Sequence, residues 1–345
     1  MTSLTEFIRR MPKVELHVHL EGAIQPSTLL TLAQRHQMPL PADDVEGIQR
    51  WYTFTDFPHF VEVYMAISER LRTPEDIELI AREFFQGQAD QNIRYSEVTY
   101  SPHMHFLQKG LSFEVQLAAL NHARAWAKET LDVDAGWVID IARTRSPDEG
   151  ERTVDWAISA MNDGVIAFGI GGKEVDNPPE KFATAFAKAR AAGLPIIPHA
   201  GETVGPISIW SALNVTNPVR LYHGVRCLED PHLVDVLRQQ QIPLDICPTS
   251  NIYLGVYPTM QDHPLPRLLA EGLYVTINSD DPPMFNTTLT NEYQVIADTF
   301  GFSAEQLEEL VMKAVRVSLL APAQKQALER AFTSEFAALR SQRTS

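Results

Sequence analysis

Apolar residues follow two different spacings along this chain, one typical of strands and one typical of helices, and segments of the two kinds alternate. Short runs rich in β-branched residues, typical of strands, are separated by longer stretches with the apolar spacing of amphipathic helices, such as 178–192 and 230–241. Eight strands joined mostly by helices predict a parallel sheet closed as a single (β/α)8 TIM barrel over residues 1–345. The expected strands are 13–19, 94–100, 134–142, 165–171, 195–199, 220–225, 243–248 and 274–279.

Two parts of the chain depart from this alternation of strands and helices. Residues 20–93 form a long gap after the first strand and contain the aromatic-rich run RWYTFTDFPHFVEVYMAI. An insertion there lies at the carboxyl face of the barrel, where this fold places its active sites. We therefore expect a helical insertion that forms a pocket wall or lid, with a purely structural packing element as the alternative. Whether 50–70 moves as a lid stays open. The tail, 303–345, reads as helical.

Composition excludes several classes of function. The chain has 345 residues, 44% hydrophobic and 21% charged, which fits a folded globule. Its net charge of −15 argues against nucleic acid and anionic membranes as partners, although a locally positive pocket still admits an anionic small substrate. The sequence shows neither a signal-peptide pattern nor an apolar run long enough for a membrane span. Cys227 and Cys247 are too few for a disulfide scaffold, and a cytoplasmic, reducing location is expected.

The first strand carries an unusual histidine pair. In PKVELHVHLEGA, His17 and His19 are two residues apart, so both imidazoles point to one face of the strand while the apolar residues take the other. Adjacent neutral imidazoles suit a metal ion. The alternative is a pair of hydrogen-bonded core histidines.

Other polar residues at strand ends strengthen the metal hypothesis. His199, His223 and Asp280 follow or end strands five, six and eight, and these ends converge at one mouth of a barrel. Three imidazoles and a carboxylate would hold a divalent ion and leave a position for water, as in catalytic zinc sites. We assign the ligands as His17, His19, His199 and Asp280. His223 is then a fifth ligand or, in better agreement with this chemistry, the group that orients the water and takes its proton.

Two further carboxyl groups lie beside these ligands. Glu202, in HAGE, can stay protonated if it is buried and then donate its proton to a substrate ring nitrogen. The alternative is a solvated loop glutamate. Asp281 cannot face the metal together with Asp280 if the strand geometry continues, so we expect it to contact the substrate or a partner of a ligand.

The motifs PKVELHVHLEGA, HAGE, HGVR and NSDDP together resemble the adenosine deaminase family of the amidohydrolase superfamily, in order from about residue 11 to 315. The resemblance implies one zinc ion per chain, a TIM barrel and a small-molecule purine substrate that loses its 6-amino group by hydrolysis. It also implies roles for individual residues. The zinc ligands are those already assigned, Glu202 protonates purine nitrogen 1, His223 and Asp280 position the attacking zinc-activated water, Asp281 bonds nitrogen 7, and the backbone N–H of Gly172 meets nitrogen 3.

The sequence departs from adenosine-specific members at the substrate side. Glu21 stands where those members have an aspartate that contacts the ribose, and HLEG is similar to members acting on adenine or on 6-aminodeoxyfutalosine. Gly169 and Lys173 replace acidic residues. Lys173 would pair with the carboxyphenyl group of aminodeoxyfutalosine, or it is a surface charge. The resemblance ranks adenosine first as substrate, aminodeoxyfutalosine second and adenine third.

Two other classes of function were weighed. A binuclear ester or amide hydrolase of the same superfamily would use a bridging lysine at the end of strand four, near Lys173, but has no need of the acid Glu202. A binding protein without activity would be expected to have lost a ligand or Glu202, and both are present. The sequence specifies no oligomeric state.

Overall fold

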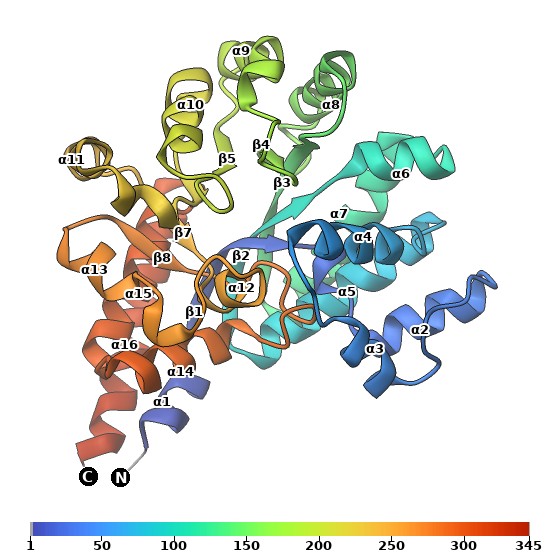
Figure 1. The fold of residues 1–345 in the computed structure, drawn as a ribbon. Coiled ribbons are helices and arrows are strands. Elements are labelled where there is room, and N and C mark those ends of the chain that lie inside the picture. The colour runs from blue at the N-terminus through green and yellow to red at the C-terminus, as the bar shows by residue number, and fades with distance from the viewer. Residues whose placement is uncertain (1–2, 345) are drawn as a thin grey trace.

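The computed structural model describes residues 3–344, and eight parallel strands form its centre in the order β1 to β8 (Figure 1). The backbone groups of His17 and His19 also bond to Asp280, beyond β8, so the last strand meets the first and the barrel closes. The eight expected strands and the barrel are therefore confirmed. The strands are β1 Lys13–His19, β2 Ile93–Tyr100, β3 Asp134–Ala142, β4 Val165–Gly171, β5 Ile196–Ala200, β6 Leu221–His223, β7 Leu244–Ile246 and β8 Val275–Ile277.

Strand β1 shows how the sequence pattern produces the barrel. Polar and apolar residues alternate along it, which on an open sheet would indicate one solvated face. Every residue of β1 is nevertheless buried. The apolar side chains join the hydrophobic clusters, whereas Glu15 bonds to Ser279 and His17 to the backbone of β7, across the barrel. The polar residues of β1 are thus buried, and each charge among them needs a partner.

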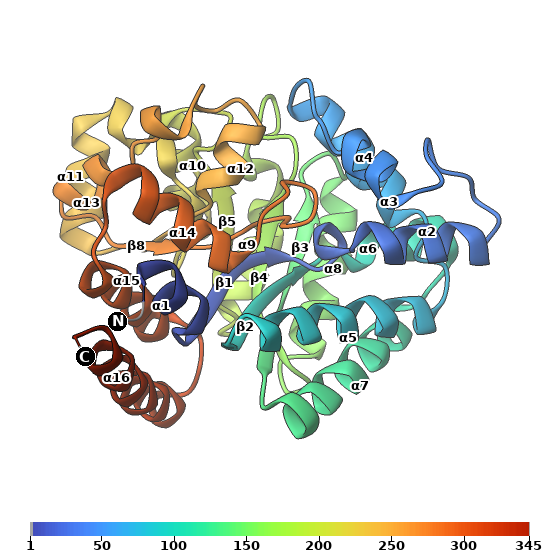
Figure 2. The same ribbon diagram turned by 90° about the horizontal axis from the view of Figure 1, so that it is seen from below.

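Helices surround the barrel on its outside, as two perpendicular views show (Figures 1 and 2). Most follow the strand–helix alternation that the sequence predicted. The helices are α1 Leu4–Arg10, α2 Pro26–Arg35, α3 Val45–Trp51, α4 Phe57–Ser68, α5 Pro74–Asp90, α6 Pro102–Lys109, α7 Phe113–Leu131, α8 Pro147–Ser159, α9 Ala183–Ala191, α10 Pro206–Thr216, α11 Pro231–Gln240, α12 Pro248–Tyr253, α13 Leu265–Ala270, α14 Leu289–Phe300, α15 Ala304–Val317 and α16 Pro322–Thr344.

The segment 20–93 has two roles. Helix α4 lines the cavity at the carboxyl end of the barrel, as expected for a pocket wall. Helix α5 instead packs against α7 and β2 on the outside of the barrel. It begins with a capping box in which Thr73 and Asp76 bond to each other's backbone N–H groups. The last part of the expected insertion is therefore the barrel's own first outer helix.

The tail is helical, as predicted, and forms α15 and α16. Phe336 of α16 stacks on Phe7 of α1, so the two ends of the described chain lie side by side. Within residues 3–344, we find no helix with the length and hydrophobicity needed to cross a bilayer. Cys227 and Cys247 are both free and buried, and the buried thiol expected at Cys247 is confirmed.

Candidate active site

Four possible metal ligands meet at the carboxyl end of the barrel. His17 and His19 come from β1, His199 from β5, and Asp280 lies just beyond β8. Their ligand atoms all lie within 4.8 Å of one another, and all four side chains are buried. Asp280 Oδ1 lies 3.3 Å from His17 Nε2 and 3.4 Å from His19 Nε2. The Nε2 atoms of His19 and His199 are 3.1 Å apart. The fold thus brings together the four residues that the sequence analysis predicted as metal ligands.

The chemistry of this donor set fits a divalent metal ion. Nδ1 of His199 lies 2.9 Å from the carbonyl oxygen of Ile170, and Nδ1 of His17 lies 3.3 Å from that of Asp245. Such contacts keep the proton on Nδ1 and leave the lone pair of Nε2 free to bind a metal ion. Nε2 of His17 is buried and has no hydrogen-bond partner among the described residues. An ion at the centre of the set would satisfy it.

Electrostatics keep these groups in the protonation states that metal binding requires. Burial lowers the pKa of His19 to about 4 and, with the neighbouring imidazoles, holds that of His199 well below its usual value. Burial alone would raise the pKa of Asp280, but His17 and the other imidazoles hold it well below the usual range. Neutral imidazoles beside a charged carboxylate are ready to coordinate a cation.

Asp280 is fixed by a partner that the sequence analysis missed. Its second oxygen, Oδ2, accepts a hydrogen bond of 2.7 Å from Ser250 in α12. The backbone of Asp280 has φ of +66°, and that of His223 has φ of +62°, a left-handed conformation that is uncommon for residues other than glycine. Backbone strain of this kind concentrates where the surrounding structure dictates the direction of a functional side chain.

Glu202 and His223 stand next to this set. The two side chains approach within 3.6 Å, and His223 Nε2 lies 3.9 Å from Oδ2 of Asp280. Burial, reinforced by the negative charges of Asp280 and Glu174, raises the pKa of Glu202 well above its usual value. Burial lowers the pKa of His223 to about 3. Burial therefore favours the protonated form of Glu202 and the neutral form of His223.

The loop that carries Glu202 is held by Glu174, which the sequence analysis did not select. The carboxylate of Glu174 accepts hydrogen bonds from the backbone N–H groups of Gly201, Thr203 and Val204 at 2.6, 2.8 and 2.7 Å. The hydroxyl groups of Thr203 and Ser208 also donate to it. One buried carboxylate thus orders the backbone on both sides of Glu202.

Asp281 lines the cavity beside Asp280, and its predicted contact with the substrate stays a prediction. Its atom Oδ1 is buried and has no hydrogen-bond partner among the described residues. Gly22 lies against this carboxyl group: a Cβ at that position would come within 1.6 Å of Oδ1 of Asp281, so only glycine fits. Burial, then the charge of Asp280, raises the pKa of Asp281 well above its usual value. A ligand atom that bonds Oδ1 would complete the site.

The other predicted substrate residues divide into two groups. Gly172 and Lys173 line the cavity and are exposed, so the lysine is not part of the buried donor set. Glu21 is only 1% exposed and does not line the cavity. It accepts hydrogen bonds from the backbone N–H of Ser101 and the hydroxyl of Tyr64, and lies 3.1 Å from His105 Nε2. In this structure Glu21 supports two residues that line the cavity, and its direct contact with a ribose stays a prediction.

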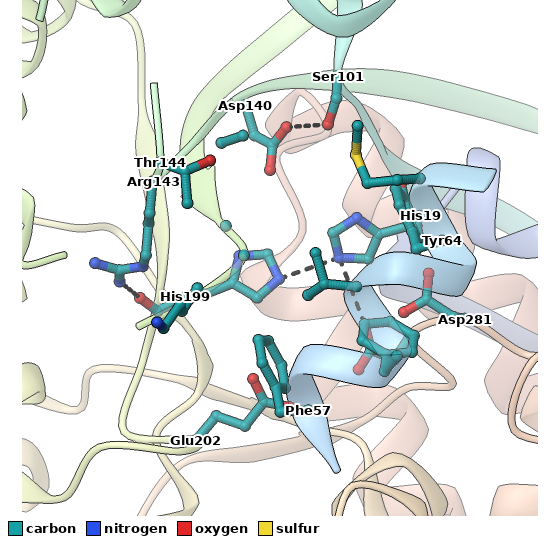
Figure 3. Close-up of a pocket in the computed structure, with 18 of the residues that line it drawn as sticks. His19, Phe57, Tyr64, Ser101, Asp140, Arg143, Thr144, His199, Glu202 and Asp281 are labelled. Atoms are coloured by element: carbon teal, nitrogen blue, oxygen red, sulfur yellow. Dashed lines mark hydrogen bonds and ion pairs between the residues drawn. The ribbon is translucent and has the colours of Figure 1, made fainter. Parts of the chain in front are cut away.

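The rest of the cavity wall combines an apolar face with polar groups (Figure 3). Helix α4 contributes most of the apolar face, with Phe57, Phe60, Val61 and Met65. The remaining apolar residues come from other elements and are Met104, Ala142 and Leu254. Sequence reasoning missed several polar wall residues, among them Ser101, Asp140, Arg143 and Arg145. They lie in or just after β2 and β3. In the sequence, only the presence of charged residues near the end of an apolar strand could have indicated them.

Comparison with known proteins identifies the family to which this chain belongs. The sequence profile described as adenosine deaminase matches residues 12–334, nearly the whole chain. The chain belongs to the adenosine deaminase family. It is similar to the aminodeoxyfutalosine deaminase of Streptomyces avermitilis, with 38% identity over 324 residues that cover 93% of this chain and 90% of that protein.

Solved structures of the family have the same fold. Adenine deaminase from Arthrobacter aurescens superposes with a TM-score of 0.90 at 33% identity, covering 94% of this chain and 98% of that one. An amidohydrolase from Burkholderia ambifaria, solved with bound zinc, gives a TM-score of 0.91 at 27% identity, covering 99% and 95% of the two chains. The family resemblance predicted from four short motifs is therefore confirmed, and the chain is a deaminase of this family.

Proposed function

We propose that this protein is a zinc-dependent deaminase that removes the 6-amino group of a purine nucleoside, and that its substrate is aminodeoxyfutalosine. The observation that carries the choice of substrate is a pair of cations at the cavity, Arg145 and Lys173. Neither side chain has an ion-pair partner among residues 3–344. Both line the same cavity as the apolar side chains of α4, and a cavity with both features suits an aromatic group that ends in a carboxylate.

One zinc ion per chain would be held by His17, His19, His199 and Asp280. Three neutral imidazoles and one carboxylate form a donor set that zinc accepts. When bound, such an ion supplies a water molecule that loses its proton near neutral pH. Ser250 and the carbonyl groups of Ile170 and Asp245 would orient the donor atoms from behind, as they already do in this structure.

The remaining chemistry belongs to the side chains around the cavity. Water adds its oxygen to purine carbon 6, nitrogen 1 takes a proton, and ammonia leaves, so a 6-oxopurine is formed. Glu202, whose protonated form is favoured by burial, would be the donor toward nitrogen 1. His223, which lies 3.6 Å from Glu202, would orient the water and take its proton. Asp281 and the backbone N–H of Gly172 would bond nitrogens 7 and 3, and thereby fix the ring.

Similar proteins support this substrate without deciding it. The aminodeoxyfutalosine deaminase of S. avermitilis shares 38% identity with this chain, and an adenine deaminase structure shares 33%. Free adenine has neither an anionic group for Arg145 and Lys173 nor a substituent to fill the apolar wall of α4. Adenosine, which the motifs favoured first, lacks the anionic group as well. We therefore place aminodeoxyfutalosine before adenosine.

Steady-state release of ammonia tests this proposal. The zinc-loaded protein should be assayed with aminodeoxyfutalosine, adenosine and adenine side by side, with metal content measured in the same preparation. We expect the highest kcat/KM for aminodeoxyfutalosine. A preference for adenosine would overturn the role of the two cations but keep purine deamination. No release from any of the three, with folded and metal-loaded protein, would contradict the proposed reaction itself.

A further inference from the structure

Asp140 is a buried carboxyl group on the cavity wall with an incomplete set of partners. It lies near the end of β3 and is 4% exposed. Its Oδ1 accepts a hydrogen bond of 2.5 Å from the hydroxyl of Ser101. Within residues 3–344, Asp140 has no ion-pair partner, and its Oδ2 accepts no side-chain hydrogen bond. A buried carboxyl group without a cation is costly unless other groups donate to it.

The space in front of Asp140 is kept open by a glycine. A Cβ at Gly171 would lie 2.8 Å from Oδ2 of Asp140 and 3.2 Å from the ring of His199. Any side chain at this position would therefore crowd the carboxyl group and the adjacent imidazole. The absence of one leaves Oδ2 accessible to a ligand in the cavity that Asp140 and Gly171 both line.

The position of Asp140 relative to Glu202 indicates which part of a ligand it meets. In the close-up, Asp140 and Ser101 lie on one side of the His19–His199 pair, and Glu202 lies on the other (Figure 3). A purine whose nitrogen 1 faces Glu202 directs its opposite end, which carries the substituent on nitrogen 9, away from Glu202. In a nucleoside that substituent is a sugar, and its hydroxyl groups are hydrogen-bond donors.

We propose that Asp140, positioned by Ser101, accepts a hydrogen bond from a hydroxyl group of the substrate's sugar and makes this enzyme select nucleosides over the free base. This inference rests on the proposed deamination of a purine nucleoside, because that reaction orients the ring. It assigns to Asp140 a contact with substrate and no part in the transfer of protons at carbon 6. Burial raises the pKa of Asp140 to about 7, as expected for a carboxyl group that lacks a partner until a donor arrives.

Deoxynucleosides provide the test. Asp140→Ala and Asp140→Asn should be compared with the unmodified protein on adenosine, 2′-deoxyadenosine and 3′-deoxyadenosine. For adenosine, we expect Asp140→Ala to lower kcat/KM about 10- to 100-fold, the usual cost of losing a hydrogen bond to a charged group. One deoxynucleoside lacks the hydroxyl group that Asp140 contacts. With this substrate, kcat/KM of the unmodified protein should already be lower than with adenosine by this factor, and Asp140→Ala should lower it further by less than about twofold. Asp155→Asn, an exposed carboxylate on α8, is the matched control.

A second variant covers the case in which Asp140→Ala fails to fold. Ser101→Ala removes the hydroxyl group that orients Oδ1 of Asp140. It should lower kcat/KM for adenosine by a smaller factor of about 3- to 10-fold, and it should leave kcat/KM nearly unchanged for the deoxynucleoside that lacks the contacted hydroxyl group. An equal loss on all three nucleosides, for either folded variant, would overturn a contact with the 2′- or 3′-hydroxyl group. An equal loss on adenine, which has no sugar, would overturn the inference as a whole, since the residue would then act on the ring or on the fold.

Binding of the product separates this inference from the proposed reaction. Inosine affinity, measured by calorimetry, does not depend on turnover. If the protein deaminates no nucleoside but binds inosine, and binds it at least about 10-fold more weakly after Asp140→Ala, the reaction is wrong and the sugar contact stands. If nucleosides are deaminated and inosine affinity is unchanged by the substitution, the reaction stands and the sugar contact is wrong.

Discussion

Glu174 accepts a hydrogen bond from the backbone N–H of Gly201, the residue directly before Glu202. The same carboxylate also accepts from the two N–H groups that follow Glu202, so it determines where the acid of the site lies. Replacement by alanine would leave three backbone donors without their acceptor. We expect Glu174→Ala to reduce kcat by about 10- to 100-fold, the size of effect that a misplacement of about 1 Å produces.

The role of Glu174 as a positioning residue can be separated from a general loss of stability. The variant should retain its metal, because Glu174 makes no hydrogen bond to the four proposed ligands, and it should bind inosine with little change if only the position of Glu202 is altered. Glu174→Gln should recover part of kcat, since one amide oxygen remains as an acceptor. If kcat falls only in step with the folded fraction, as followed by circular dichroism, Glu174 has a structural role alone.

Glu202→Gln tests the acid directly. The amide occupies nearly the same volume but cannot transfer a proton to a ring nitrogen. Turnover should fall by about 100-fold or more, within the usual range for general acid catalysis, while the metal content stays at that of the unmodified protein. Near-normal kcat in this variant would show that another group protonates the ring.

His17→Ala tests the metal site. His17 is fully buried, and its Nε2 makes no hydrogen bond in the described part of the chain, although Oδ1 of Asp280 lies 3.3 Å away. The variant should lose metal and activity together, and a chelator should do the same to the unmodified protein, with recovery on addition of zinc. Metal analysis and ammonia release on the same samples give the comparison. Activity that survives complete metal removal would contradict the assignment.

Arg145→Ala and Lys173→Ala test the cations at the cavity. Each should lower kcat/KM for aminodeoxyfutalosine by about 5- to 10-fold, because both side chains are partly solvated and their interactions are screened. The effect should weaken as salt concentration rises. Adenosine, which has no anionic group, should be affected by less than about twofold. Equal losses on the two substrates would remove both residues from substrate selection.

Much of this site was predictable because its residues follow a simple positional rule. His17, His199 and Asp280 are far apart in sequence, but each lies at the carboxyl end of a strand, and a closed parallel barrel brings such ends together. The alternation in β1 located one pair of the proposed ligands, and the adjacency of Asp280 and Asp281 led to different proposed roles for the two carboxyl groups.

Other parts depended on contacts that no local pattern encodes. Glu174 looks like a surface residue of a polar loop, and only the fold shows that it meets the loop of Glu202. Glu21 follows the histidine pair directly, yet the chain turns there and directs its carboxylate toward Ser101 and Tyr64. Helix α5 was assigned to the insertion because the first strand–helix connection is long, although its cap at Thr73 marked the start of a separate helix.

Glu292 should make stability depend on pH. This fully buried side chain of α14 accepts hydrogen bonds from the backbone N–H of Thr249 and the hydroxyl of Thr287. Burial raises its pKa from 4.5 to about 7. Between these values the folded state holds a proton that the unfolded state has released. The contribution of this proton to the free energy of unfolding is therefore fully present below about pH 4.5 and is lost as pH rises through about 7. The free energy of unfolding should fall by about 2–3 kcal/mol over this range.

Glu292→Gln isolates this contribution, because the amide does not titrate. The difference in Tm between the variant and the unmodified protein should shift in favour of the variant as pH rises from about 4.5 to about 7. Other groups that titrate in this range are common to both proteins and cancel in the difference. Glu129→Gln, an exposed position on α7, provides the control. A difference in Tm for Glu292→Gln that stays constant across this range would mean that the carboxyl group is ionised in the folded protein throughout, so that its two donors compensate for burial.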